Sequence, residues 1–219
     1  MDQGIRPEKV DVLYNAVAVD EIKPARDPVA VRGDLGADRD TPVVGAFGHL
    51  SEKKGYRELF AAIPNVLSFI PTAQFWIVGQ GGMRDQLEQM ASVGGYLKQI
   101  RFTGFRRDVA DVMNAVDVMA LPSHREPFGL VYVEAALLEK PTVGCRAGGA
   151  PESIADGETG LLVPVGDPAG IAEAIVSLLE DRDLAQRMGQ AGRSRALDLF
   201  SWPTFVTRLE SAYDRVVGG

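Results

Sequence analysis

The chain has 219 residues, of which 46% are hydrophobic and 24% are charged, an ordinary composition for a globular protein with one good core. Its formal net charge of −7 argues against a groove that follows nucleic acid, because such a groove needs a basic surface. The single cysteine, Cys145, lies in an apolar run, so we expect a buried thiol and no internal disulfide. No apolar run approaches the ~18 residues that span a membrane, and the first residues lack the apolar segment of a signal peptide.

The first part of the chain differs in composition from the rest. Residues 10–14 predict a short strand, and the stretch that follows them is rich in proline, glycine and charge. We interpret residues 1–41 as a lead-in strand and an interdomain linker remnant. Residues 42–219 are then expected to form the folded domain.

From residue 42 onward, short apolar runs alternate with helical segments. The runs predict six strands at 43–47, 74–78, 100–103, 117–121, 141–145 and 160–163. Helices are expected between them at about 55–70, 84–91, 109–115, 129–139 and 151–155, and the C-terminal part is expected to be helical. Continuous apolar strands are typical of a parallel sheet covered on both faces. The pattern therefore predicts a doubly wound α/β domain with C-terminal helices.

In an open α/β sheet, ligands bind beyond the carboxyl ends of the strands. The loops to inspect are therefore those that follow Phe47, Val78, Thr103, Leu121 and Cys145. We expect the chemistry of this chain in these loops.

The loop after Leu121 runs from a strand end into a helix and contains Glu126, Pro127, Phe128 and Gly129. Gly129 lets a ligand approach the backbone closely. The amides of Gly129 and Leu130 are expected at the helix start, where free N–H groups and the helix dipole favour a phosphate.

Two carboxylates flank this helix start. Glu126 precedes the helix and Glu134 lies more than a turn inside it, with seven residues between them. Carboxylates suit vicinal hydroxyls because they accept two donors at once. One glutamate is expected to hold hydroxyls of a sugar, and the other a ribose diol.

The loop after Phe47 can supply cations beside such a ligand. Lys54 directly precedes Gly55 and can place a compact charge on a phosphate, and His49 can donate a hydrogen bond. His124 is interpreted as a loop residue rather than a catalytic base. Gly148 and its neighbour are interpreted as a turn or as a contact to sugar or phosphate.

From about residue 10 to the end, the chain resembles the C-terminal domain of the large retaining glycosyltransferase family called group 1. The order and spacing of several segments together carry this resemblance, and the glutamates at 126 and 134 match the paired-glutamate motif of that family. The matching segments are 14–17, 48–55, 78–82, 102–105, 123–129, 134–135, 148–152 and 157–161.

The resemblance implies one Rossmann-like half of a GT-B fold that binds a nucleotide sugar. It implies that Glu126 contacts sugar hydroxyls and that Lys54 binds the diphosphate, with Gly48 and His49 beside it; Glu126 and Lys54 are the catalytic candidates. Glu134 is implied to bind the ribose, and Phe105 and Arg106 to border the base. The sugar and diphosphate are implied to be lined by Phe128, Gly129 and Leu130. The family usually has arginine where His49 stands, and a histidine is neither bidentate nor charged by default.

The resemblance also implies partners and a reaction. The complete enzyme is expected to transfer a hexose-type sugar from a UDP- or GDP-type donor with retention, without a metal or other cofactor. The acceptor site is expected in an N-terminal domain missing from this chain, so that the isolated domain binds donor without useful turnover. A cytoplasmic location is expected, with membrane-peripheral attachment of the complete enzyme as an alternative. Two alternative functions are open for the chain: part of a GT-B epimerase or phosphorylase, or a degenerate, non-catalytic binding module.

Overall fold

The computed structural model describes residues 10–217, which form an α/β domain around one six-stranded sheet. The strands lie in the order β3-β2-β1-β4-β5-β6, and all neighbouring strands are parallel. Their bounds are β1 Val43–Phe47, β2 Gln74–Val78, β3 Ile100–Gly104, β4 Val118–Ala120, β5 Thr142–Cys145 and β6 Gly160–Val163. This is the strand order of a Rossmann-like, doubly wound sheet, as the sequence predicted.

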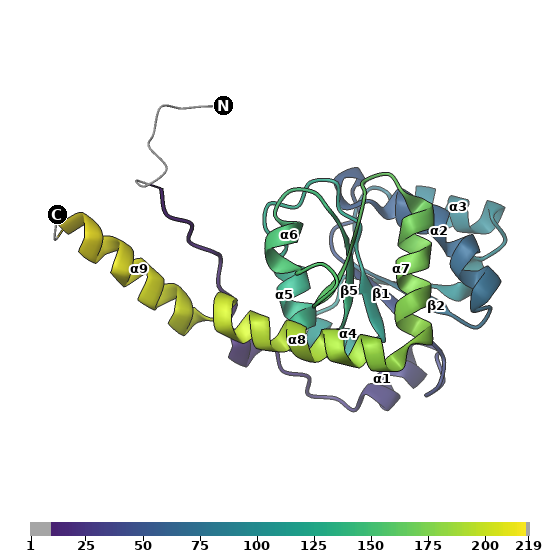
Figure 1. Ribbon diagram of the computed structural model, residues 1–219. Coiled ribbons are helices and arrows are strands. Elements are labelled where there is room, and N and C mark those ends of the chain that lie inside the picture. The colour runs from purple at the N-terminus through teal and green to yellow at the C-terminus, as the bar shows by residue number, and fades with distance from the viewer. Residues whose placement is uncertain (1–9, 218–219) are drawn as a thin grey trace.

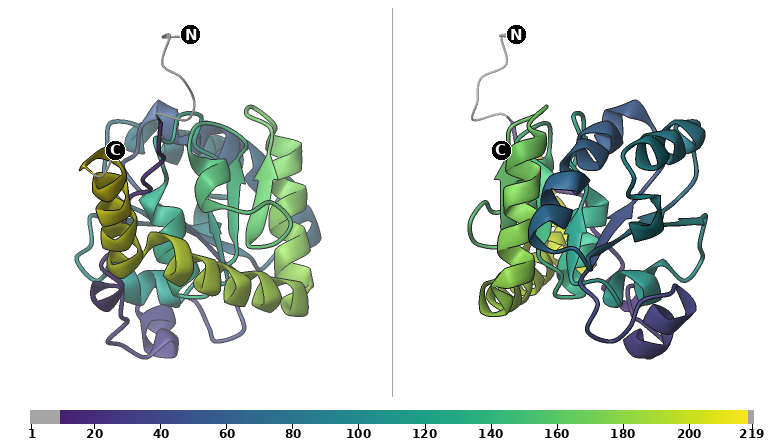
Figure 2. Two further views of the ribbon diagram at one scale, coloured as in Figure 1. Left: turned by 60° about the vertical axis from the view of Figure 1, so that its left-hand side comes forward. Right: turned by 90° about the vertical axis from the view of Figure 1, so that its right-hand side faces the viewer.

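Helices lie on both faces of the sheet (Figures 1 and 2). Helix α2 packs against α7 on one side, and α5 packs against α8 on the other. The helices are α1 Pro28–Asp34, α2 Tyr56–Phe69, α3 Arg84–Val93, α4 Val109–Asn114, α5 Leu130–Leu137, α6 Ala150–Ser153, α7 Pro168–Glu180, α8 Arg182–Phe200 and α9 Trp202–Val217. The predicted helices are therefore present, with ends that differ by a few residues.

The sheet is buried because its strands carry apolar side chains on both faces. All five residues of β1 are buried, and Trp76 of β2 is fully enclosed. Cys145 ends β5 as a buried free thiol, and burial raises its pKa to about 11. The prediction of a core cysteine is confirmed.

The lead-in differs from the strand that was predicted for residues 10–14. These residues pair with no strand, and Val10 and Val12 are exposed, so the prediction of a strand there was wrong. The backbone bridge lies further on, where the Val17 amide donates to the Phe200 carbonyl at 2.8 Å. The first nine residues of the predicted lead-in lie outside the described part.

A helix also lies within the stretch interpreted as linker. The carboxylate of Asp27 accepts a hydrogen bond from the Val29 amide at 3.1 Å and caps α1, whose first residue is Pro28. Val31 is fully buried, and Arg32 donates to Asp117 at 2.8 Å. Helix α1 therefore packs on the same core as the sheet.

The C-terminal helix α9 extends away from the body of the domain (Figure 1). It has no buried residue, and Trp202 packs edge-on against Phe205 with 5.3 Å between the ring centroids. Among the described helices, none has the length and apolar character needed to cross a membrane.

Candidate functional site

The ten residues singled out from the sequence line one pocket of about 700 Å³. It lies at the carboxyl ends of β1, β2, β3 and β4, where the strand order reverses between β1 and β4. The ten are Gly48, His49, Lys54, Phe105, Arg106, Glu126, Phe128, Gly129, Leu130 and Glu134.

Two residues of the pocket lining form an ion pair that the sequence did not reveal. The short 3-10 helix η3 (Glu52–Lys54) places the Lys54 ammonium 2.6 Å from the Glu126 carboxylate. The side chains are 18% and 8% exposed, so both charges are largely shielded from water. The cation and the carboxylate, assigned from the sequence to different parts of a ligand, are therefore paired with each other.

Two glycines allow the loops of this pocket to pack closely. Gly55 has a φ of 71°, and a Cβ there would lie 1.9 Å from the carbonyl oxygen of Pro122. Gly148 has a φ of 56°, and a Cβ there would lie 2.3 Å from the carbonyl oxygen of Glu126. Neither Gly148 nor Gly149 lines the pocket. Gly148 and Gly149 instead pack against the backbone of the Glu126 loop, and the Gly149 amide donates to the Glu126 carbonyl at 2.7 Å.

The start of α5 presents free backbone amides to the pocket. Gly129 precedes the helix with a φ of 96°, and no side chain caps this end. The loop is held from behind, since the Tyr132 hydroxyl donates to the Leu121 carbonyl at 2.5 Å and the Ser153 hydroxyl to the Phe128 carbonyl at 2.9 Å. A rigid, uncapped helix N-terminus is a favourable place for phosphate oxygens.

Phe128 links the pocket to the lead-in. Its ring stacks on Tyr14 with 5.9 Å between centroids and meets Phe200 edge-on at 5.2 Å. It is 7% exposed and lines the pocket while packing in this aromatic cluster. Residues before β1 and the end of α8 therefore help to hold the wall of the pocket.

Glu134 contributes a second carboxylate to the pocket. It lies within α5, more than a turn beyond the helix start, and is half-buried. Burial raises the pKa of this carboxyl, and no ion pair or hydrogen bond among the described residues offsets the effect. An unpartnered carboxylate is suited to accept hydrogen bonds from a pair of hydroxyls.

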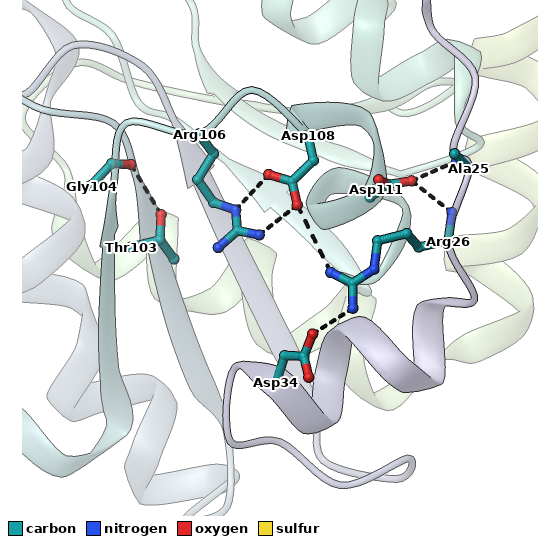
Figure 3. A network of polar contacts seen from close by, with 8 residues as sticks. All are labelled: Ala25, Arg26, Asp34, Thr103, Gly104, Arg106, Asp108 and Asp111. Atoms are coloured by element: carbon teal, nitrogen blue, oxygen red, sulfur yellow. Dashed lines mark hydrogen bonds and ion pairs between the residues drawn. The ribbon is translucent and has the colours of Figure 1, made fainter.

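Arg106 closes another side of the pocket and is held by a neighbouring carboxylate (Figure 3). Its guanidinium donates to both oxygens of Asp108, with Nε–Oδ1 at 2.8 Å and Nη2–Oδ2 at 2.5 Å. The hydrogen bond from Arg106 lowers the pKa of Asp108, while burial opposes the shift. Phe105 is 67% exposed at the rim of the pocket, where a flat ligand can lie against its ring.

The lead-in is tied to the same network. Asp111 of α4 accepts hydrogen bonds from the backbone amides of Ala25 and Arg26 at 2.6 and 2.9 Å (Figure 3). The Arg26 guanidinium pairs with Asp34 of α1 and lies 3.9 Å from Asp108. The chain segment before α1 is thereby fixed next to the Arg106 side of the pocket.

The two histidines have different positions. His49 is exposed and lines the pocket. His124 does not line it, and its Nε2 lies 3.1 Å from a Glu58 carboxylate oxygen. This placement agrees with the interpretation of His124 as a loop residue.

Sequence reasoning missed some residues of the pocket. Asn15, Gln80, Val109 and Val131 also line it. Gln80 follows β2, so the rule about strand ends points to its loop, and Val131 lies in the predicted helix start. Asn15 follows no strand and reaches the pocket from the lead-in, so its sequence signal was its place in segment 14–17, which matches the family. Within residues 10–217, no group of three or more His, Cys, Asp or Glu side chains is arranged to hold a metal ion.

The free helix amides, the lysine and the two carboxylates in one pocket are chemically suited to a ligand that carries phosphate and hydroxyl groups. The chain matches the family of glycosyl transferases group 1 over residues 30–195, and it belongs to this family. Over 170 residues it is 34% identical to the lipopolysaccharide core biosynthesis glycosyltransferase LpsE of Rhizobium meliloti, a match that covers 78% of this chain and 49% of LpsE. Over 222 residues it is 32% identical to a D-inositol 3-phosphate glycosyltransferase of Corynebacterium kroppenstedtii, covering 96% of this chain and 49% of that protein.

The chain therefore spans about half the length of these curated relatives. Among solved structures it is similar to Anabaena Alr3699/HepE in complex with UDP, with a TM-score of 0.88 and 30% identity over 97% of this chain and 59% of that one. It also matches the C-terminal domain of the group 1 protein LpcC from Francisella tularensis, with a TM-score of 0.73 and 26% identity, over 85% of this chain and 100% of that one. The predicted fold, one Rossmann-like half of a GT-B glycosyltransferase, is confirmed.

Proposed function

We propose that this domain binds the nucleoside diphosphate sugar of a retaining glycosyltransferase that transfers a hexose-type sugar. One observation carries the proposal: a lysine, an uncapped helix start and two carboxylates, all predicted from the sequence, line a single pocket. The likeness to Alr3699/HepE in complex with UDP favours a uridine donor, and GDP remains the alternative.

The diphosphate is proposed to lie at the start of α5. The amides of Gly129 and Leu130 and the ammonium of Lys54 then face the phosphate oxygens. As the bond to the sugar breaks, negative charge grows on the leaving diphosphate, and these donors stabilise it without moving. The same groups take the role that a divalent ion has elsewhere, so we propose a reaction without a metal.

The hydroxyls of the donor are proposed to meet the two glutamates. Glu126, beside Lys54, accepts hydrogen bonds from the sugar, and Glu134 accepts them from the ribose diol. Phe105 and Arg106 border the base, and Phe128 lines the sugar. The acceptor is proposed to bind to a part of the enzyme outside these 219 residues, because the relatives are about twice as long. We therefore propose that the chain itself binds the donor without useful turnover. We also propose a cytoplasmic location for the enzyme.

Calorimetry on the 219-residue chain tests the proposal. UDP, GDP and ADP, and the corresponding nucleotide sugars, are titrated into the chain with and without EDTA. We expect one nucleoside diphosphate to bind at micromolar to millimolar concentration, with an affinity that EDTA leaves unchanged. If none binds at millimolar concentration, the proposed donor site is wrong.

The stereochemistry needs the longer enzyme. NMR of the product reports the anomeric configuration directly, and we expect the configuration of the donor to be retained. An inverted product contradicts the retaining assignment without affecting the donor site.

A further inference from the structure

A second pocket, of about 580 Å³, lies at the opposite end of the sheet from the donor pocket. It is lined by residues that precede β1, β4 and β5, such as Thr41, Asp117 and Lys140. Its lining includes residues of α1 and of the start of α8, and both segments lie at this end of the sheet (Figure 1). A ligand there has no contact with the donor pocket, because the lengths of β1 and β4 separate the two.

In this pocket more basic than acidic side chains lack an ion-pair partner among the described residues. Arg39, Lys140 and Arg182 line it, and none of them has a carboxylate within 4.0 Å among the described residues. Two of the three acidic side chains in the lining are already engaged. Asp117 accepts from Arg32 at 2.8 Å, and Glu139 lies 3.8 Å from Arg193.

Asp40 is the remaining carboxylate of the lining. Arg32, the fourth cation of the lining, is paired with Asp117, so within residues 10–217 three cations and one carboxylate of the lining have no ion-pair partner, in a chain whose net charge is −7. A local positive surplus on an acidic protein attracts anions to this place in particular.

A tight turn brings Lys140 into the pocket. Glu139 is the one residue other than glycine with positive φ, 57°, in the described part of the chain. The turn ends α5, since the Lys140 amide donates to the Ala135 carbonyl at 2.9 Å. Lys140 is partly buried as a result. Burial lowers the pKa of its ammonium, while the charges of Asp117 and Glu139 oppose the shift, and a bound anion would oppose it further.

We propose that this pocket binds a small phosphate monoester with hydroxyl groups. A phosphate monoester carries about −1.5 to −2 charges at neutral pH, which complements a surplus of two cations. Asn114, Gln186 and Thr41 in the same lining offer neutral polar groups for hydroxyls. The volume of about 580 Å³ accommodates a molecule of metabolite size.

The probes are glycerol 3-phosphate and inorganic phosphate, with glycerol as the uncharged control. They are titrated into the ¹⁵N-labelled 219-residue chain with saturating UDP, so that phosphate does not enter the donor pocket. We expect amide shifts centred on residues 39–41, 114–117 and 139–140, with glycerol 3-phosphate binding more tightly than phosphate and glycerol not binding. If UDP itself does not bind, the location of the shifts still distinguishes this pocket from the loop at Gly129.

Variants test the cations. Lys140→Met and Arg182→Gln are each expected to lower the affinity for glycerol 3-phosphate at least about fivefold, within the range for the loss of a charge-assisted hydrogen bond. The matched control is Arg187→Gln, an exposed arginine of α8 outside the pocket, which leaves the affinity unchanged. The proposal is overturned if shifts appear elsewhere or not at all, or if both Lys140→Met and Arg182→Gln bind as the original chain does.

Discussion

The ammonium of Lys54 lies 2.6 Å from the carboxylate of Glu126, and the two side chains are 18% and 8% exposed. Shielding a single charge from water costs free energy, so each of the two side chains depends on the opposite charge of the other. A bound donor changes this relationship under the proposed function. Phosphate oxygens then share Lys54, and sugar hydroxyls donate to Glu126.

Lys54→Met is expected to lower both stability and diphosphate affinity. The change leaves the Glu126 carboxylate shielded and unpaired, which we expect to cost about 3 kcal/mol in urea unfolding. UDP affinity should fall at least about tenfold, the effect of a lost charge-assisted bond, while uridine binding stays the same. Lys53→Met, at the exposed neighbour, is the control and should change neither. Equal losses for UDP and uridine contradict a phosphate role for Lys54.

The double variant Lys54→Met/Glu126→Gln separates stability from function. Replacing both charges removes the unpaired carboxylate, so most of the lost unfolding free energy should return. UDP binding should remain weak, because the cation is still absent. If affinity returns together with stability, Lys54 acts only by supporting the fold.

Glu134→Gln is expected to stabilise the chain and to weaken recognition of the ribose. Burial raises the pKa of Glu134 above the unfolded value of about 4.3. Its favourable contribution is therefore present below the unfolded pKa and is lost as pH rises through the folded pKa. At pH about 7 the glutamine variant should therefore melt at a higher temperature than the original chain, and the gain should vanish as the pH falls below the unfolded pKa.

The same variant has a specific binding readout. The original chain should prefer UDP to 2′-deoxy-UDP, and Glu134→Gln should reduce this preference. Glu173→Gln, an exposed position on α7, is the control for both measurements. An unchanged preference would remove Glu134 from the ribose site.

His49→Arg is expected to tighten UDP binding several-fold. His49 is exposed at the pocket, and a guanidinium is charged at every working pH and binds phosphate with two parallel bonds. Calorimetry should show the gain for UDP and none for uridine. If UDP binding does not change, the His49 side chain does not reach the phosphates.

Much of the fold was predictable because parallel strands are buried on both faces and appear as continuous apolar runs, as in residues 43–47. The position of the pocket was predictable, since the carboxyl ends of such strands collect the loops that carry Lys54, Glu126 and Gly129. Helix α1 was hidden, because its start is marked by only Asp27 and Pro28 within a charged stretch.

Contacts between distant segments were not predictable from local patterns. Lys54 and Glu126 are 72 positions apart, and their pairing depends on Gly55 packing against Pro122. The role of Gly148 under the Glu126 loop depends in the same way on the folded chain. Asn15 reaches the pocket because the nearby Val17 amide donates a hydrogen bond to the carbonyl of Phe200, at the end of α8. This contact joins segments that are far apart in the sequence.

The most direct test of the donor site is an NMR titration of UDP into the ¹⁵N-labelled 219-residue chain. The largest amide shifts are expected at residues 48–54, 105–109 and 128–131, with the start of α5 among the strongest. Shifts spread over the far end of the sheet, or no shifts at millimolar UDP, would contradict the account.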